Sequence, residues 1–113
     1  MLTVAKEAGE VRGYILISKG WNNYAVIDDF AVDRNIRRAG IGTRLMDQAV
    51  EWAKEHGLPG LRLETQSNNV QACRFYRKYG FDLGGHDKYL YTALEQSCSE
   101  IALFWYLKFA RLL

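Results

Sequence analysis

Several classes of protein are excluded by what the 113-residue sequence lacks. Its two cysteines, Cys73 and Cys98, are too few for a disulfide framework and fit no metal-binding spacing, so no metal is expected. The 15 Lys and Arg residues are nearly balanced by 13 Asp and Glu residues, which is not typical of a nucleic-acid-binding protein. The start, MLTVAKEAGEVRG, has no signal-peptide core, and the apolar tail is interrupted by Lys108 and Arg111. We expect a cytoplasmic protein with reduced thiols and no membrane partner.

The length predicts a single domain, residues 1–113, and the hydrophobic pattern predicts a mixed α/β fold. The expected order is β-β-β-α-β-α-β-β, with a largely antiparallel sheet and helices packed on it. Strands are expected at 2–7, 11–20, 24–32, 61–66, in two pieces at 81–85 and 88–92, and at 100–109, and helices from 43 to 56 and from 70 to 79. The segment 100–109 is apolar on both faces, as in a buried strand, although its length also permits a helix.

The stretch RRAGIG, residues 37–42, lies between the third predicted strand and the first predicted helix. The first amides of a helix have no intrahelical acceptor and carry positive potential. Without a Cβ atom at Gly40 and Gly42, a phosphate can approach these amides, and Arg37 and Arg38 add positive charge. The alternative is a loop that needs positive φ angles beside two solvated arginines.

Two motifs together give the sequence a definite resemblance. Arg37-x-x-Gly40-x-Gly42 resembles the R/Q-x-x-G-x-G/A signature of the GNAT superfamily of N-acetyltransferases, which binds the pyrophosphate of acetyl-CoA. A second motif of the superfamily follows as Asn69-x-x-Ala72-x-x-Phe75-Tyr76-x-x-x-Gly80-Phe81. Within the superfamily, the stretches LETQ and ACRFY and the tail look most like the streptothricin acetyltransferases.

The resemblance implies roles in binding acetyl-CoA, the acetyl donor. The backbone around Phe30 and Val32 would pair with the pantetheine arm, and Ala72 would leave room for the cofactor. Asn69 would contact the cofactor, cap the second helix, or do both. The pyrophosphate would bind the amides from Arg38 to Thr43. These amides belong to the glycine turn, which comprises Arg37, Arg38, Ala39, Gly40, Ile41, Gly42 and Thr43.

The same resemblance implies that Tyr76 is the acid that protonates the leaving thiolate. Tyr76 also belongs to an aromatic stripe with Phe75 and Tyr79, which is otherwise typical of a core, and Tyr79 is expected there. Candidates for accepting the proton of the attacking amine are acids on the predicted strands, namely Glu64, Asp28 and Asp29. Adjacent acids in a strand point to opposite faces, so one of the two aspartates is expected to face a cleft or a partner.

The sequence departs from the superfamily at its start, because no strand and pair of helices precede Leu2. These helices usually form a wall of the acceptor site. We therefore expect exposed apolar surface on the sheet and on the Val50–Ala53 side of the first helix, and a homodimer that covers it.

The leading hypothesis is transfer of an acetyl group to a primary amine of a small cationic molecule, such as streptothricin. The alternatives are acetylation of protein lysines or N-termini, and a catalytically inactive acyl-CoA-binding module. A remnant without any ligand would leave the glycine turn unexplained.

Overall fold

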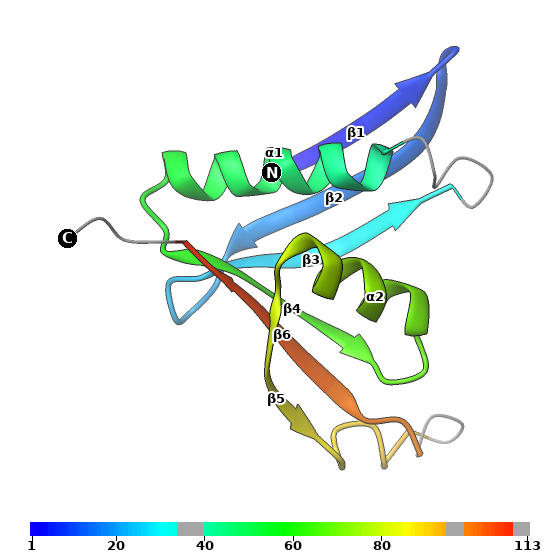
Figure 1. The fold of residues 1–113 in the computed structure, drawn as a ribbon, viewed down its shortest axis with the longest axis vertical. Helices are drawn as coiled ribbons and strands as arrows, with labels where there is room; N and C mark the ends of the chain where they lie inside the picture. The colour runs from blue at the N-terminus through cyan, green and yellow to red at the C-terminus, as the bar shows by residue number, and fades with distance from the viewer. Residues whose placement is uncertain (34–39, 95–98, 110–113) are drawn as a thin grey trace. The chain divides into compact units, whose positions relative to one another are not determined.

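A computed structural model describes residues 1–33, 40–94 and 99–109 (Figure 1). These residues form six strands and two helices in the predicted order β-β-β-α-β-α-β-β, which confirms the mixed α/β fold class. Two compact units are present, one of residues 1–61 and one that begins at Arg62. The prediction of a single domain over residues 1–113 stays a prediction. Neither described helix is long and apolar enough to cross a membrane.

The first unit contains an antiparallel meander and one helix. Strands β1 and β2 form a hairpin, and β3 pairs with the other side of β2. The hairpin turns at Ala8 and Gly9, whose φ angles of 51° and 80° are both left-handed, as two-residue hairpin loops require. The elements are β1 (Leu2–Glu7), β2 (Glu10–Lys19), β3 (Ala25–Val32) and α1 (Ile41–Glu55).

Helix α1 packs on the meander through its apolar face. Alternate residues of β2 and β3 are buried, among them Ile15, Ile17 and Ile27, while the face of α1 that carries Leu45 and Met46 is buried as well. The approach is close, because a Cβ atom at Gly13 would lie 2.9 Å from the Ala31 carbonyl oxygen and 3.1 Å from Leu45 Cδ1. The helix ends at His56, whose ring stacks on Trp52 with ring centroids 4.2 Å apart.

The exposed apolar surface of this unit agrees with the prediction on the sheet but not on helix α1. Ala53 is fully buried and Val50 half-buried, so the expectation of an exposed Val50–Ala53 side is wrong, because this side of α1 belongs to its packed face. The other half of the prediction, exposed apolar surface on the sheet, is confirmed on the hairpin of β1 and β2. Leu2 and Leu16 are cross-strand partners, and with Val4 they are between 38% and 60% exposed.

The second unit combines α2 with a short sheet. Strand β4 begins at the end of the first unit, and β6 lies between β4 and β5. Strands β5 and β6 are antiparallel, with the bulge at Gly84 that the Gly84–Gly85 pair predicted. The segment 88–92, predicted as a strand piece, forms turns instead, so this prediction is wrong. The elements are β4 (Gly60–Gln66), α2 (Val70–Tyr79), β5 (Asp82–Asp87) and β6 (Ala102–Lys108).

Candidate functional site

The start of α1 has the features of an anion-binding helix terminus. Gly40 is the N-cap residue, with the left-handed angles φ 76° and ψ 12°, and no side chain of the described residues caps the helix. No acidic residue lies in the first turn, and nothing would lie within 4 Å of a Cβ atom at Gly40. Ile41 and Gly42 are buried, whereas Thr43 is exposed. Within residues 1–33, 40–94 and 99–109, no acidic or capping side chain therefore occupies the amides of the first turn, where an anion is favoured.

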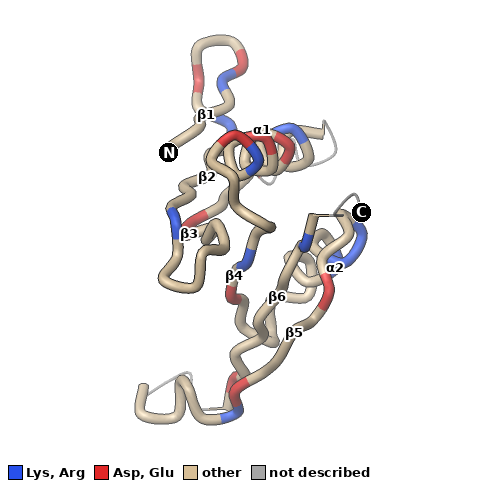
Figure 2. Tube along the Cα trace, turned by 90° about the vertical axis from the view of Figure 1, so that its left-hand side faces the viewer, with Lys and Arg blue, Asp and Glu red and all other residues tan. Residues whose placement is uncertain are grey.

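The glycine turn is described only in part. Helix α1 begins at Ile41, two residues before the predicted start, so Gly42 is a helical residue. Of the two glycines, Gly40 alone has the positive φ angle that the alternative explanation, a strained loop, required of both. The predicted phosphate-binding residues Arg37, Arg38 and Ala39 lie outside the described residues. Elsewhere, charged residues of both signs are spread along each unit, in agreement with the balanced composition (Figure 2).

A β-bulge in β3 changes how its two acids are presented. Leu16 pairs with Asp29 and Ile17 with Ile27, so Asp28 is an extra residue without a cross-strand partner. Both aspartates are exposed, and the expected simple alternation between the two faces of the strand is interrupted here.

The two aspartates differ in their hydrogen bonds. The Asp29 carboxylate accepts from the Tyr14 hydroxyl at 2.8 Å and from the Phe30 amide at 2.9 Å. The bond to Asp29 is also the main reason why the pKa of Tyr14 is raised. Asp28 has no hydrogen bond or ion pair within the described parts of the chain, so its carboxylate is the more available of the two for a ligand.

The second motif places three predicted residues on α2. Asn69 is the N-cap residue, and its Oδ1 accepts from the Ala72 amide at 3.2 Å, which confirms its capping role. Ala72 is half-buried. Tyr76 is 7% exposed, the only residue of α2 counted as buried.

Tyr76 lies within an aromatic cluster. Its ring makes edge contacts with Phe75 and Phe81, with centroid distances of 5.7 and 5.5 Å, and it lies 6.4 Å from Trp105. Burial raises the pKa of Tyr76 to about 12, with a smaller contribution from Cys73. The phenol therefore keeps its proton at neutral pH. Tyr79 contacts Phe75 and Phe81, with ring centroids 6.1 and 6.0 Å apart, but it is only half-buried, so it lies at the edge of the core and not within it as predicted.

A buried polar contact fixes the position of Trp105, and the sequence analysis missed it. The Trp105 Nε1–H group donates to Thr65 Oγ1 at 3.0 Å, and the Arg77 guanidinium lies 5.8 Å from the centre of the same ring. Thr65 is a buried polar residue of β4, and its hydroxyl also lies 3.7 Å from Cys73 Sγ. Since Trp105 packs against Tyr76, this contact helps to hold the aromatic cluster in place.

Glu64 has a partner that the sequence analysis also missed. The Tyr91 hydroxyl donates to Glu64 Oε2, and burial together with this carboxylate raises the pKa of Tyr91 to about 12. The only sequence signal for Tyr91 was its place in KYLYT, and that stretch was assigned to a strand.

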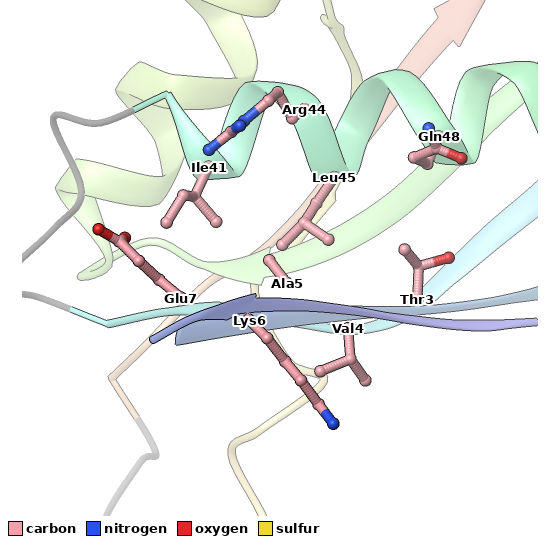
Figure 3. A pocket seen from close by; sticks show the side chains of 9 residues that line it. All are labelled: Thr3, Val4, Ala5, Lys6, Glu7, Ile41, Arg44, Leu45 and Gln48. Carbon is pink, nitrogen blue, oxygen red and sulfur yellow. The ribbon is translucent and has the colours of Figure 1, made fainter. Parts of the chain in front are cut away.

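A groove of about 570 Å³ lies between β1 and α1 in the first unit (Figure 3). Ile41, Leu45 and Arg44 line it from the helix, while Val4 and Lys6 point to the other face of β1. Among the residues that the structure describes, Ile41 is the one predicted site residue that lines the groove, so the groove does not unite the described members of the predicted site.

Comparison with known proteins assigns the chain to a family. Residues 1–81 match the family model described as Acetyltransferase (GNAT) family. The chain belongs to the GNAT acetyltransferase family. Streptothricin acetyltransferase A of Bacillus subtilis is 48% identical over 97 residues, which cover 86% of this chain and 56% of that protein. The streptothricin acetyltransferase of Escherichia coli is 41% identical with the same coverage.

Solved structures support the same fold for this GNAT chain. A Bacillus anthracis protein assigned as a streptothricin acetyltransferase, in complex with acetyl coenzyme A, superposes with a TM-score of 0.92. It is 47% identical, and the match covers 96% of this chain and 61% of that one. Nourseothricin acetyltransferase superposes with a TM-score of 0.83 at 36% identity, over 88% of this chain and 59% of the other. The GNAT chain thus spans somewhat more than half the length of these relatives.

The hydrogen bond between Thr65 and Trp105 can be tested by a change that keeps the shape of the side chain. In Thr65→Val the Trp105 Nε1–H group loses its acceptor in a buried place, which costs about 1–3 kcal/mol. We expect urea denaturation to show this loss and the Trp105 indole N–H signal to shift in NMR spectra. Thr65→Ser is the control, because it retains the hydroxyl and leaves that signal near its position. An unmoved signal in Thr65→Val would contradict the assignment of this bond.

Proposed function

We propose that the protein is an acetyl-CoA-dependent N-acetyltransferase that acts on a primary amine of a small cationic molecule. The observation that carries the proposal is the start of α1, where a left-handed glycine precedes helix amides that no side chain of the described chain caps. The names of the relatives support the reaction class and suggest streptothricin as the acceptor.

The described residues fit the donor at its anionic end. The helix dipole and the amides of Gly40, Ile41, Gly42 and Thr43 favour a pyrophosphate, and no carboxylate in the first turn opposes it. Arg37, Arg38 and Ala39 complete this part of the site in the proposal. Phe30 and Val32 are proposed to pair with the pantetheine arm, and Asn69 and Ala72 to line the path of the cofactor.

Acetyl-CoA supplies an activated acetyl group as a thioester. The amine nitrogen of the acceptor forms a bond to the acetyl carbon, and the bond from that carbon to sulfur breaks. Tyr76 donates its hydroxyl proton to the departing sulfur and regains a proton from solvent. A carboxylate accepts the proton that the amine loses, with Glu64 and Asp28 better suited than Asp29, whose carboxylate accepts two internal hydrogen bonds.

The raised pKa of Tyr76 has two consequences for this role. A phenol with a pKa of about 12 holds its proton throughout the neutral range, so the donor is always present. It is also a weaker acid than an ordinary phenol. Proton transfer to sulfur is therefore favoured only as the carbon–sulfur bond breaks and negative charge develops on sulfur.

We further propose that the protein is a cytoplasmic homodimer. Cys73 has a free thiol, which is typical of reducing compartments. The exposed apolar residues Leu2, Val4 and Leu16 of the hairpin support association with a second copy.

Calorimetric titration with acetyl-CoA tests the proposed donor site. We expect one binding site per chain, and at least a tenfold loss of affinity in Gly40→Asp, because its carboxylate repels the pyrophosphate. Gly57→Asp is a matched control, since Gly57 follows the other end of α1 with a similar φ of 69° and equally open surroundings. Equal affinities of the two variants would contradict the placement of the pyrophosphate, and no binding to the unaltered protein would refute the function.

The acid role of Tyr76 is tested by Tyr76→Phe, with Tyr79→Phe as the control in the same aromatic cluster. We expect kcat for streptothricin acetylation to fall by about 10²–10⁴ in Tyr76→Phe, because the proton donor is lost. Affinity for acetyl-CoA is expected to persist, and Tyr79→Phe is expected to retain most of its activity. If both variants turned over equally fast, Tyr76 would have no role as the acid.

Light scattering of the purified chain measures the proposed dimer directly. We expect a mass about twice the 13.0 kDa of one chain. Val4→Lys places a charge on the apolar patch and is expected to shift the mass towards one chain. A monomer at micromolar concentration without any substitution would rule the dimer out.

A further inference from the structure

The turns that follow β5 hold Tyr91 in a defined place. The Tyr89 amide donates to Asp87 Oδ1 at 2.8 Å, and the Thr92 hydroxyl donates to the Tyr89 carbonyl at 2.9 Å. The Leu94 amide donates to the Tyr91 carbonyl at 2.9 Å. These bonds fix the backbone on both sides of Tyr91, and the backbone in turn limits where the Tyr91 ring can lie.

The Tyr91 hydroxyl forms a hydrogen bond with a carboxylate on β4. It donates to Oε2 of Glu64, an exposed residue that the turns approach from far along the chain. A hydrogen bond to a charged acceptor is stronger than one between neutral groups. Glu64 Oε1 accepts no hydrogen bond from residues 1–33, 40–94 or 99–109, and the Glu64 side chain is exposed with respect to these residues.

We propose that Tyr91 is a positioning residue, which holds Glu64 through Oε2 so that Oε1 binds the ammonium group of the acceptor. The inference rests on the proposed function and deepens it, because it assigns recognition of the cationic acceptor to this pair. An exposed carboxylate by itself samples several rotamers, and ordering it during binding costs free energy. Tyr91 removes part of that cost before the acceptor arrives.

This arrangement predicts which acceptors bind well. The ammonium group has three N–H donors and can use Oε1 without displacing Tyr91 from Oε2. A neutral analogue of the acceptor would gain much less from the pair, because its attraction to the carboxylate lacks the charge. The pair therefore selects amines that arrive protonated, and the carboxylate is then in contact with the nitrogen from which a proton must leave.

A double-mutant cycle with streptothricin tests the inference. Calorimetry gives the dissociation constant for the unaltered protein, Tyr91→Phe, Glu64→Gln and the double variant. We expect Tyr91→Phe to weaken binding about tenfold, in line with the loss of a hydrogen bond to a charged group. In the Glu64→Gln background the same change is expected to have less than a twofold effect, because the carboxylate on which Tyr91 acts is absent.

The control is Tyr89→Phe, which removes a hydroxyl from an exposed tyrosine of the same turns and is expected to bind streptothricin normally. Equal affinities of Tyr91→Phe and the unaltered protein would overturn the inference. The inference would also be overturned if the fold-changes in dissociation constant of the two single variants multiplied in the double variant, because Tyr91 would then act independently of Glu64. If the protein bound acetyl-CoA but not streptothricin, the proposed recognition of the acceptor would be refuted, whereas the proposed donor site would not.

Discussion

The first unit depends on one close approach, that of α1 to β2 at Gly13. The space for a side chain at this position is taken by the Ala31 carbonyl oxygen, by Leu45 and by Ile41, all within 3.3 Å of where a Cβ atom would lie. A larger residue would push the helix away from the strands. Since Ile41 is also the first residue of α1, the same contact fixes the start of the helix, and with it the amides proposed to bind the donor.

The elements whose signals are local could be predicted from the sequence. The change of hydrophobic period from two to 3.6 identified α1, and Asn69 and Gly80 marked the two ends of α2. The first helix was predicted to begin at Thr43, where the hydrophobic period changes, and Gly42 was assigned to the turn. The structure shows that Gly40 is the N-cap residue and that Gly42 is already helical.

The features that the sequence analysis missed depend on partners far apart in the chain. The bulge at Asp28 arises from the register against Leu16 and Ile17, which no pattern within β3 reveals. Thr65 and Trp105 are 40 residues apart, and either alone has the properties of an ordinary strand residue. Tyr91 alternates with its neighbours as in a strand, but hydrogen bonds within the segment favour turns. The roles of Arg37, Arg38 and Ala39 stay predictions.

The buried Trp105 is an intrinsic fluorescent probe of the second unit. Trp105 is 2% exposed and hydrogen-bonded, whereas Trp21 in the first unit is 89% exposed. An indole in an apolar place and one in water fluoresce at different wavelengths, and Trp52 is further distinguished by the imidazole stacked on it. Unfolding of the second unit exposes Trp105 to water and therefore shifts its emission, whereas unfolding of the first unit does not expose Trp105. The intrinsic fluorescence can thus report whether the two units unfold in one step or in sequence.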